Sequence, residues 1–388
     1  MTNQKTETKA LHSGYRADPS TGSVAVPIYQ TTSYQFQDTD HAARLFELSE
    51  LGNIYTRIMN PTNDVLEKRL ADMEGGVAAL AVASGQAASL YSIQNIARAG
   101  DNFVCSSHIY GGTFNLFKNT FKDMGIEARF VDPRDPENFR NATDDNTRAY
   151  YAETYPNPSF EVFPIGEVAS IGLEYGVPLI MDNTAAPIIC KPFDHGAAIT
   201  MYSTTKYLGG HGNSIGGIII DSGKFDWEAH QKRFPSLREP DSGYHGAVWI
   251  EAAKPLGPIA YILKARVTLL RDAGAAMSPF NAFLFLQGIE TVALRMERHC
   301  DNAMAVAAYL NSHPKVEKVI HPSVQEGEIK RRADTYLGGT YGGLMGVELK
   351  GGKEAGQAFI NKLKMFYHVA NIGDSKSLAI HPATTTHA

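Results

Sequence analysis

The sequence predicts an α/β fold with a mostly parallel sheet, followed by a smaller α+β domain. Between residues 77 and 220, short apolar runs alternate with amphipathic stretches, and this alternation is typical of parallel sheets covered by helices on both faces. Gly100, Gly125 and Gly176 close amphipathic stretches and indicate where helices end. The 388 residues exceed what one hydrophobic core usually serves, so two packed domains are expected.

The elements of the larger domain, residues 61–258, follow from periodicity. Leu66, Leu70 and Met73 recur at helical spacing, and Gly75-Gly76 ends that helix. The expected strands are Val77–Val82, Asn102–Cys105, Ala128–Val131, Ala149–Ala152, Val177–Met181, Ile199–Tyr202 and Ile215–Ile220. The expected helices between them are Gln86–Arg98, Thr113–Met124 and Glu167–Tyr175.

The two ends of the chain differ from this pattern. Residues 1–60 are rich in Thr, Ser, Gly, Pro and Tyr and have little periodicity, which favours an irregular arm that reaches a neighbouring subunit. Residues 259–388 form the expected smaller domain, with helices at Ile259–Ala276 and Thr291–Leu310 and a strand at Gly343–Leu349.

Composition excludes several classes of function. The net charge of −5 offers no basic surface for nucleic acid or for an anionic membrane. No apolar stretch reaches the roughly 20 residues needed to span a bilayer, and Met1 to Ala10 lacks a signal-peptide core. The three cysteines are far apart, which favours a reducing cytoplasm over a disulfide framework. His195, His211, His245 and His299 have no metal-ligand spacing, so no metal site is expected.

Three groups of residues fall at the ends of expected strands, where α/β folds bind ligands. The turn Ser84-Gly85-Gln86 begins a helix, which is usually only a cap but can also bind an anion. Asp182 closes one apolar run, and Ser203, Thr205 and Lys206 follow the next. Together they fit a site for pyridoxal phosphate (PLP), in which a lysine amine holds the aldehyde and a carboxylate pairs with the ring nitrogen.

A glycine-rich stretch, residues 209–217, has a different interpretation. It resembles a nucleotide-binding loop, but such a loop follows its strand, whereas here the strand comes after the glycines. We therefore expect a turn that leads away from Lys206.

Several motifs resemble the Cys/Met-metabolism family of PLP enzymes, over a match from about Leu11 to the last residue. The motifs are Tyr55-Thr56-Arg57, Ser84-Gly85-Gln86-Ala87, Asp182-Asn183-Thr184 and Ser203-Thr204-Thr205-Lys206, together with Ala25–Tyr34. The resemblance implies an aspartate-aminotransferase-like fold (fold type I), PLP as cofactor, and a homo-oligomer, expected to be a tetramer, whose active sites are shared between subunits.

The resemblance also implies individual roles. Lys206 would hold PLP as a Schiff base and then shuttle protons, Asp182 would bind the ring nitrogen, and Tyr110 would stack on the ring. The residues implied to bind the cofactor are Tyr55 and Arg57 of the neighbouring subunit, Ser84, Gly85, Gln86, Tyr110, Asn157, Asp182, Thr184, Ser203, Thr205 and Lys206. The residues implied to bind the substrate are Tyr55, Asn157 and Ser377.

Two further segments indicate the reaction. The long stretch Phe225–Ala276 and the segment Asn371–Ser377 resemble the branch of the family that replaces the acetate of O-acetyl-L-homoserine with sulfide or a thiol. Methionine γ-lyase or cystathionine γ-synthase activity is the alternative. Family members continue beyond the position of Ala388 and supply there an arginine for the substrate carboxylate. A truncated C-terminal domain is therefore expected, and a chain that binds PLP without turnover is the second possibility.

Overall fold

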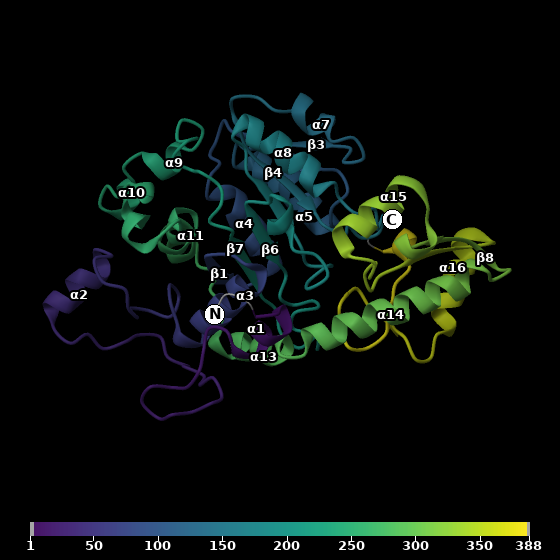
Figure 1. The fold of residues 1–388 in the computed structure, drawn as a ribbon, viewed down its shortest axis with the longest axis horizontal. Coiled ribbons are helices and arrows are strands. Elements are labelled where there is room, and N and C mark those ends of the chain that lie inside the picture. The colour runs from purple at the N-terminus through teal and green to yellow at the C-terminus, as the bar shows by residue number, and fades with distance from the viewer. Residues whose placement is uncertain (1–3, 386–388) are drawn as a thin grey trace.

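The larger part of the molecule is built on one seven-stranded sheet. The computed structural model describes residues 4–385 (Figure 1), and the strands follow the order β1-β7-β6-β5-β4-β2-β3. Strands β2 to β6 are parallel, whereas β7 lies antiparallel between β1 and β6. The prediction of a mostly parallel sheet is confirmed.

The expected apolar runs lie in these strands, and helices connect most of them. The strands are β1 (Ala78–Val82), β2 (Asn102–Ser106), β3 (Glu127–Val131), β4 (Thr147–Glu153), β5 (Leu179–Asp182), β6 (Ile199–Tyr202) and β7 (Gly217–Asp221). The helical elements up to β7 are α3 (Pro61–Glu74), α4 (Gly85–Gln94), α5 (Gly111–Asn115), the π turn η1 (Leu116–Thr120), α6 (Phe121–Asp123), α7 (Glu137–Asn141), α8 (Ile165–Tyr175) and the short turn η2 (Pro192–His195).

The sheet is buried on both faces, which explains why its strands are continuous apolar runs. In β7, Ile218 and Ile220 join one hydrophobic cluster, with residues of α3, α8 and α13 (Pro279–Ile289). Ile219 joins the other cluster, with residues of α4 and α11 (Ala260–Ala265). Because side chains alternate along a strand, each strand supplies both clusters.

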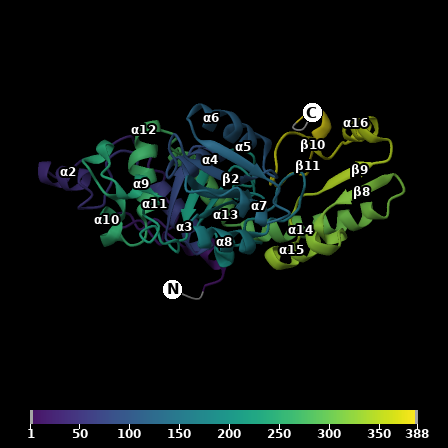
Figure 2. The same ribbon diagram turned by 90° about the horizontal axis from the view of Figure 1, so that it is seen from above.

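A smaller domain follows α13, to the right in Figures 1 and 2. Strands β8 and β9 pair antiparallel, and β10 and β11 form a short parallel pair. The elements are α14 (Val292–Asn311), β8 (Val316–Ile320), η6 (Pro322–Val324), α15 (Gly327–Leu337), β9 (Gly346–Leu349), α16 (Gly352–Lys362), β10 (Tyr367–His368), β11 (Leu378–Ala379) and η7 (Pro382–Thr384). The expected α+β character is confirmed.

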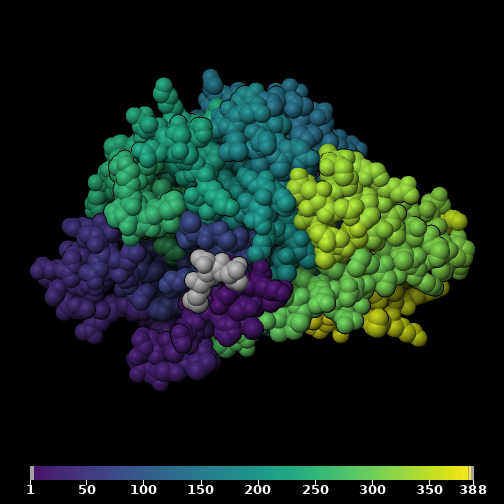
Figure 3. All heavy atoms as spheres, viewed as in Figure 1, coloured from purple at the N-terminus to yellow at the C-terminus, as the bar shows by residue number. Residues whose placement is uncertain are grey.

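Part of the N-terminal arm (residues 4–60) protrudes from the sheet domain, as the purple region of Figure 3 shows. The arm contains two helices, α1 (Thr6–His12) and α2 (Thr39–Phe46). The first is tied to α3 by the ammonium of Lys9, which lies 3.0 Å from a carboxylate oxygen of Asp72. The stretch between residues 13 and 38 has no helix. Whether the arm reaches a neighbouring subunit stays a prediction.

The segment between β7 and α13, here called the connecting segment (residues 225–276), packs against helix α4. The ammonium of Lys264 donates to the carbonyl of Asn95 at 2.7 Å, at the C-terminal end of α4. At the other end, the N–H of Ala83 donates to the carbonyl of Ala275 at 2.6 Å. The segment contains α9 (Pro235–Arg238), η3 (Ser242–Tyr244), α10 (Trp249–Ala253), η4 (Lys254–Leu256), α11, the π turn η5 (Arg266–Leu270) and α12 (Arg271–Ala273). It therefore contacts α4 or its immediate flank at both ends.

Candidate active site

The carboxyl ends of the parallel strands gather the residues that the sequence singles out. Asp182 ends β5, and Ser203 follows the last residue of β6, its neighbour in the sheet. The backbone N–H of Ser203 donates to the hydroxyl of Thr184 at 2.8 Å, which ties the two strand ends together. Ser84 and Gly85 follow β1 and begin α4. These residues form one continuous edge.

The N-terminus of α4 has the features of an anion site. The Ser84 side chain accepts from the N–H of Ala87 at 3.1 Å, while the N–H groups of Gly85 and Gln86 donate to no group within residues 4–385. A Cβ added at Gly85 would lie 2.6 Å from Cβ of Ser203, so only glycine allows this approach. Free N–H groups at a helix N-terminus, beside a serine hydroxyl, suit a phosphate group.

The two hydroxyls after β6 have different surroundings. The Oγ of Ser203 would lie 3.0 Å from an added Cβ at Gly85 and hydrogen bonds to no other residue of the described chain. The hydroxyl of Thr205 is bonded to the backbone of Gly216, accepting from its N–H at 3.1 Å and lying 3.3 Å from its carbonyl. Ser203 is therefore the hydroxyl that is free to bind a ligand directly.

Asp182 is a carboxyl group in an environment that favours its neutral form. Burial raises the pKa of Asp182 to about 6, against hydrogen bonds from Thr184 and Tyr151, which lower it. The N–H of Thr184 donates to Oδ1 at 2.9 Å. A cationic ring nitrogen placed against this carboxyl would favour its ionised form.

Lys206 extends from the edge towards the smaller domain. Its ammonium donates to Oδ1 of Asn371 at 2.9 Å, and burial lowers the pKa of the amine. The segment that carries Asn371 is itself held against the loop after Lys206, because the N–H of Ser375 donates to the carbonyl of Gly210 at 2.8 Å. The lysine therefore lies where the two domains meet.

The remaining predicted residues are spread more widely. Tyr110 precedes α5, and its side chain is 55% exposed. Asn157 lies partly buried in the turn after β4, and Ser377 is exposed, its carbonyl accepting from the N–H of Tyr367 at 2.9 Å. Within the described residues, no hydrogen bond or ion pair joins the side chain of Tyr55 or Arg57 to the strand edge; the Arg57 guanidinium donates instead to the carbonyl of Arg271 at 2.9 Å.

Two residues of the site, Asn371 and Glu153, were given no individual role from the sequence. Asn371 is 165 positions from Lys206, and only the packing of the two domains brings them together. Glu153 ends β4 beside Asp182. The sequence contained a signal for this residue, because Glu153 closes the apolar run Ala149–Ala152 just as Asp182 closes its own run. Nowhere in residues 4–385 do three or more His, Cys, Asp or Glu side chains gather as metal ligands would.

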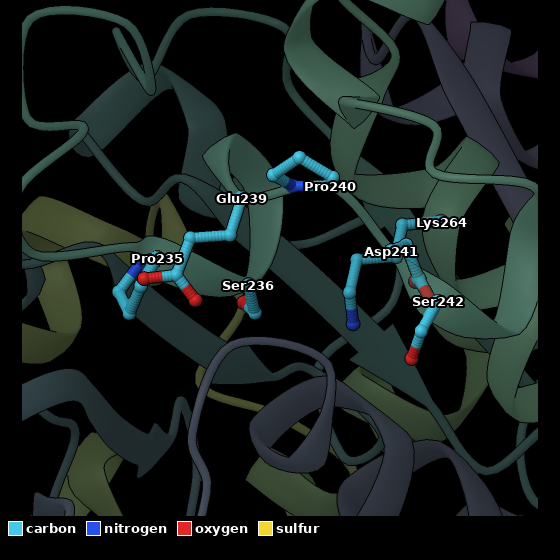
Figure 4. A pocket seen from close by; sticks show the side chains of 7 residues that line it. All are labelled: Pro235, Ser236, Glu239, Pro240, Asp241, Ser242 and Lys264. Carbon is cyan, nitrogen blue, oxygen red and sulfur yellow. The ribbon is translucent and has the colours of Figure 1, made fainter.

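A separate cavity of about 190 Å³ lies in the connecting segment (Figure 4). Its lining residues are Pro235, Ser236, Glu239, Pro240, Asp241, Ser242 and Lys264. Because the Lys264 ammonium binds the C-terminal end of α4, this cavity lies at the opposite end of that helix from Gly85. It is distinct from the strand-end site.

Comparisons with known proteins show the family of this chain. Residues 7–388 match the family model for Cys/Met metabolism PLP-dependent enzymes. The chain is 55% identical over 392 residues to an O-acetyl-L-homoserine sulfhydrylase of Leptospira meyeri, covering 99% of this chain and 88% of that protein. It is 47% identical over 383 residues to the homocysteine synthase of Schizosaccharomyces pombe, covering 98% and 89%.

A solved structure is also similar over nearly the whole chain. The crystal structure of a putative O-acetylhomoserine (thiol)-lyase from Campylobacter jejuni subsp. jejuni superposes with a TM-score of 0.95 at 41% identity, covering 99% of this chain and 91% of that one. That structure contains N'-pyridoxyl-lysine-5'-monophosphate. With the family model matched almost from end to end, the chain belongs to the Cys/Met metabolism family of PLP-dependent enzymes.

Proposed function

We propose that this enzyme is an O-acetylhomoserine sulfhydrylase, a transferase that replaces the acetate of O-acetyl-L-homoserine with sulfide or a thiol. The products are L-homocysteine or L-methionine, and acetate. The observation that carries the proposal is the placement of Asp182, Lys206 and the N-terminus of α4 after the ends of β5, β6 and β1, in a chain 55% identical to a protein with that name.

The residues of the edge fit PLP group by group. The N–H groups of Gly85 and Gln86 and the Ser203 hydroxyl suit the phosphate, while Thr205, Thr184 and Ser84 support them through the contacts described above. Asp182 suits the ring nitrogen, the Lys206 amine the aldehyde, and Tyr110 the ring face. When bound, the cofactor withdraws electrons from the Cα of an amino acid.

Lys206 is the group that we assign to proton transfer. A γ-replacement requires protons to leave Cα and then Cβ of the same substrate. Burial lowers the pKa of the lysine amine, so more of it is neutral and able to accept a proton near neutral pH. The bond to Asn371 holds Nζ at the domain boundary when the amine is free. One positioned amine can then serve both carbons.

Substrate binding and assembly are proposed together. Asn157 and Ser377 would contact the amino acid, along with Tyr55. In this chain Arg57 lies near Tyr55 and binds Arg271 rather than the strand edge, which supports their acting in the site of a neighbouring subunit. The assembly that we propose is a homotetramer, tested by mass in solution at several concentrations.

We also propose a cytoplasmic location. Cys105, Cys190 and Cys300 are free and buried, as suits a reducing compartment. Among residues 4–385, no helix combines the length and apolarity needed to cross a membrane.

The test uses the purified chain supplied with PLP. O-acetyl-L-homoserine and sulfide should give homocysteine and acetate, and Lys206→Ala should lose both the long-wavelength absorbance of the bound cofactor and turnover. Lys122→Ala, at an exposed lysine of α6, is the matched control and should keep both. Turnover by the Lys206 variant would contradict the assignment. Ammonia and 2-oxobutanoate from methionine as main products would instead assign a γ-lyase.

A further inference from the structure

Glu153 is a second carboxyl group at the strand edge, and none of the roles above uses it. It ends β4 and is the cross-strand partner of Asp182 in the parallel pair β4–β5. Only 8% of its surface is exposed. A carboxyl group is rarely buried to this degree without a specific partner.

The partner of Glu153 is the backbone of Tyr110. Oε1 of Glu153 accepts from the N–H of Tyr110 at 2.5 Å. Tyr110 directly precedes α5, with φ −53° and ψ 134°, so its N–H lies outside the helical hydrogen bonds. Its ring lies over Gly112, where an added Cβ would be 2.4 Å from Cε1 of the tyrosine. Glu153 therefore holds the backbone from which the exposed ring projects.

Glu153 and Asp182 are neighbouring buried acids, and the pKa of each is raised. Burial, and then the nearby Asp182, raise the pKa of Glu153 well above its usual range, against the N–H of Tyr110, which lowers it. Burial also raises the pKa of Asp182, against hydrogen bonds from Thr184 and Tyr151. The other titratable groups facing Glu153 are the Tyr151 phenol and the Cys105 thiol, both neutral because burial raises the pKa of each. A raised pKa favours the neutral carboxyl of Glu153, whose Oε1 can still accept from the N–H of Tyr110.

We propose that Glu153 is a positioning residue, which fixes Tyr110 through its backbone N–H. The proposal rests on the proposed function, since it takes Tyr110 as the residue against the ring. It requires a hydrogen-bond acceptor at position 153.

The experiment compares Glu153→Gln, which keeps an acceptor without a charge, with Glu153→Met, which has similar size and no acceptor. Three readouts are measured: the Kd for PLP, the pH dependence of the cofactor absorbance, and kcat and KM for O-acetyl-L-homoserine. The glutamine variant should stay within about threefold of the parent in all constants. The methionine variant should raise the Kd for PLP about tenfold, as loss of one buried acceptor implies. Glu354→Gln, at an exposed acid of α16, is the control and should change nothing.

A double-mutant cycle tests whether Glu153 acts through Tyr110. In a Tyr110→Ala background, Glu153→Met should raise the Kd for PLP by less than about twofold further, since coupled residues are not additive. Additive losses would overturn the proposal, and so would a glutamine variant that loses as much as the methionine variant. Because PLP binding is measured without turnover, a parent protein that binds PLP but forms no homocysteine would refute the proposed function and leave this comparison intact.

Discussion

Asp221 makes the stability of the sheet depend on pH. It ends β7 and is 0% exposed; Oδ1 accepts from the N–H of Gly223 at 2.9 Å, and Oδ2 has no partner within residues 4–385. Burial raises the pKa of Asp221 from 3.8 to about 7. The folded chain therefore keeps a proton that the unfolded chain releases between about pH 4 and 7, so this carboxyl lowers the free energy of unfolding as pH rises.

The magnitude follows from the size of the shift. At about 1.4 kcal/mol for each pH unit, the full effect is about 4 kcal/mol, of which about 3 kcal/mol falls between pH 5 and pH 8. Asp221→Asn removes the titration. The free energy of unfolding of this variant, minus that of the parent, should therefore rise by about 3 kcal/mol between those pH values. Taking the difference between the two pH values cancels any fixed cost of the amide.

The assay is urea unfolding followed by circular dichroism at pH 5, 6, 7 and 8. Asp123→Asn, at an exposed carboxyl of α6, is the control and should follow the parent throughout. Parallel pH profiles for the Asp221 variant and the parent would refute the reasoning, since the buried carboxyl would then titrate as it does in the unfolded chain.

Three further predictions concern the site and its support. Gly85→Ala places a Cβ 2.6 Å from Cβ of Ser203, and such overpacking typically costs about 1–3 kcal/mol. Because the displaced groups are those that suit the phosphate, the Kd for PLP should rise at least about tenfold, while the Tm of the whole chain changes little. Unchanged PLP affinity would contradict the close approach. Asn371→Ala removes the hydrogen bond to Lys206, so kcat should fall about two- to tenfold with the cofactor absorbance retained; an unchanged kcat would argue against the contact. Burial lowers the pKa of Lys264 from 10.5 to about 8, so the folded chain gains stability as pH rises between these values. Relative to Lys264→Met, the free energy of unfolding of the parent should increase by about 3 kcal/mol over that range in urea titrations, and a constant difference would contradict this.

The sheet and its strand-end residues could be predicted because their causes are local. Strands buried on both faces are unbroken apolar runs in the sequence. The run Val177–Met181, for example, corresponds to the observed strand Leu179–Asp182. Parallel strands end at one edge, so Asp182 and Ser203 had to meet. Gly85 was expected at the turn for the same reason, because the first helix after β1 begins there.

What escaped prediction depends on packing between distant segments. The contact of Lys206 with Asn371 spans 165 positions, and no local pattern encodes the docking of two domains. The arm was expected to be irregular, yet Thr6–His12 is a helix, held by the ion pair from Lys9 to α3. The helix expected over Ile259–Ala276 ends at Ala273, because Gly274 adopts φ +91°, a conformation that glycine accepts readily.

The connecting segment supports helix α4, which begins at the strand-end site. Residues 225–276 supply partners for the carbonyl of Asn95 and for the N–H of Ala83, which flank helix α4 on either side. An exchanged segment without a lysine at the position of Lys264 would leave the carbonyl of Asn95 without this partner at the C-terminal end of α4. Asn95 also uses its side chain, since its amide donates to the carbonyl of Tyr261 at 2.8 Å, so a chimera that transfers the segment should keep asparagine at position 95.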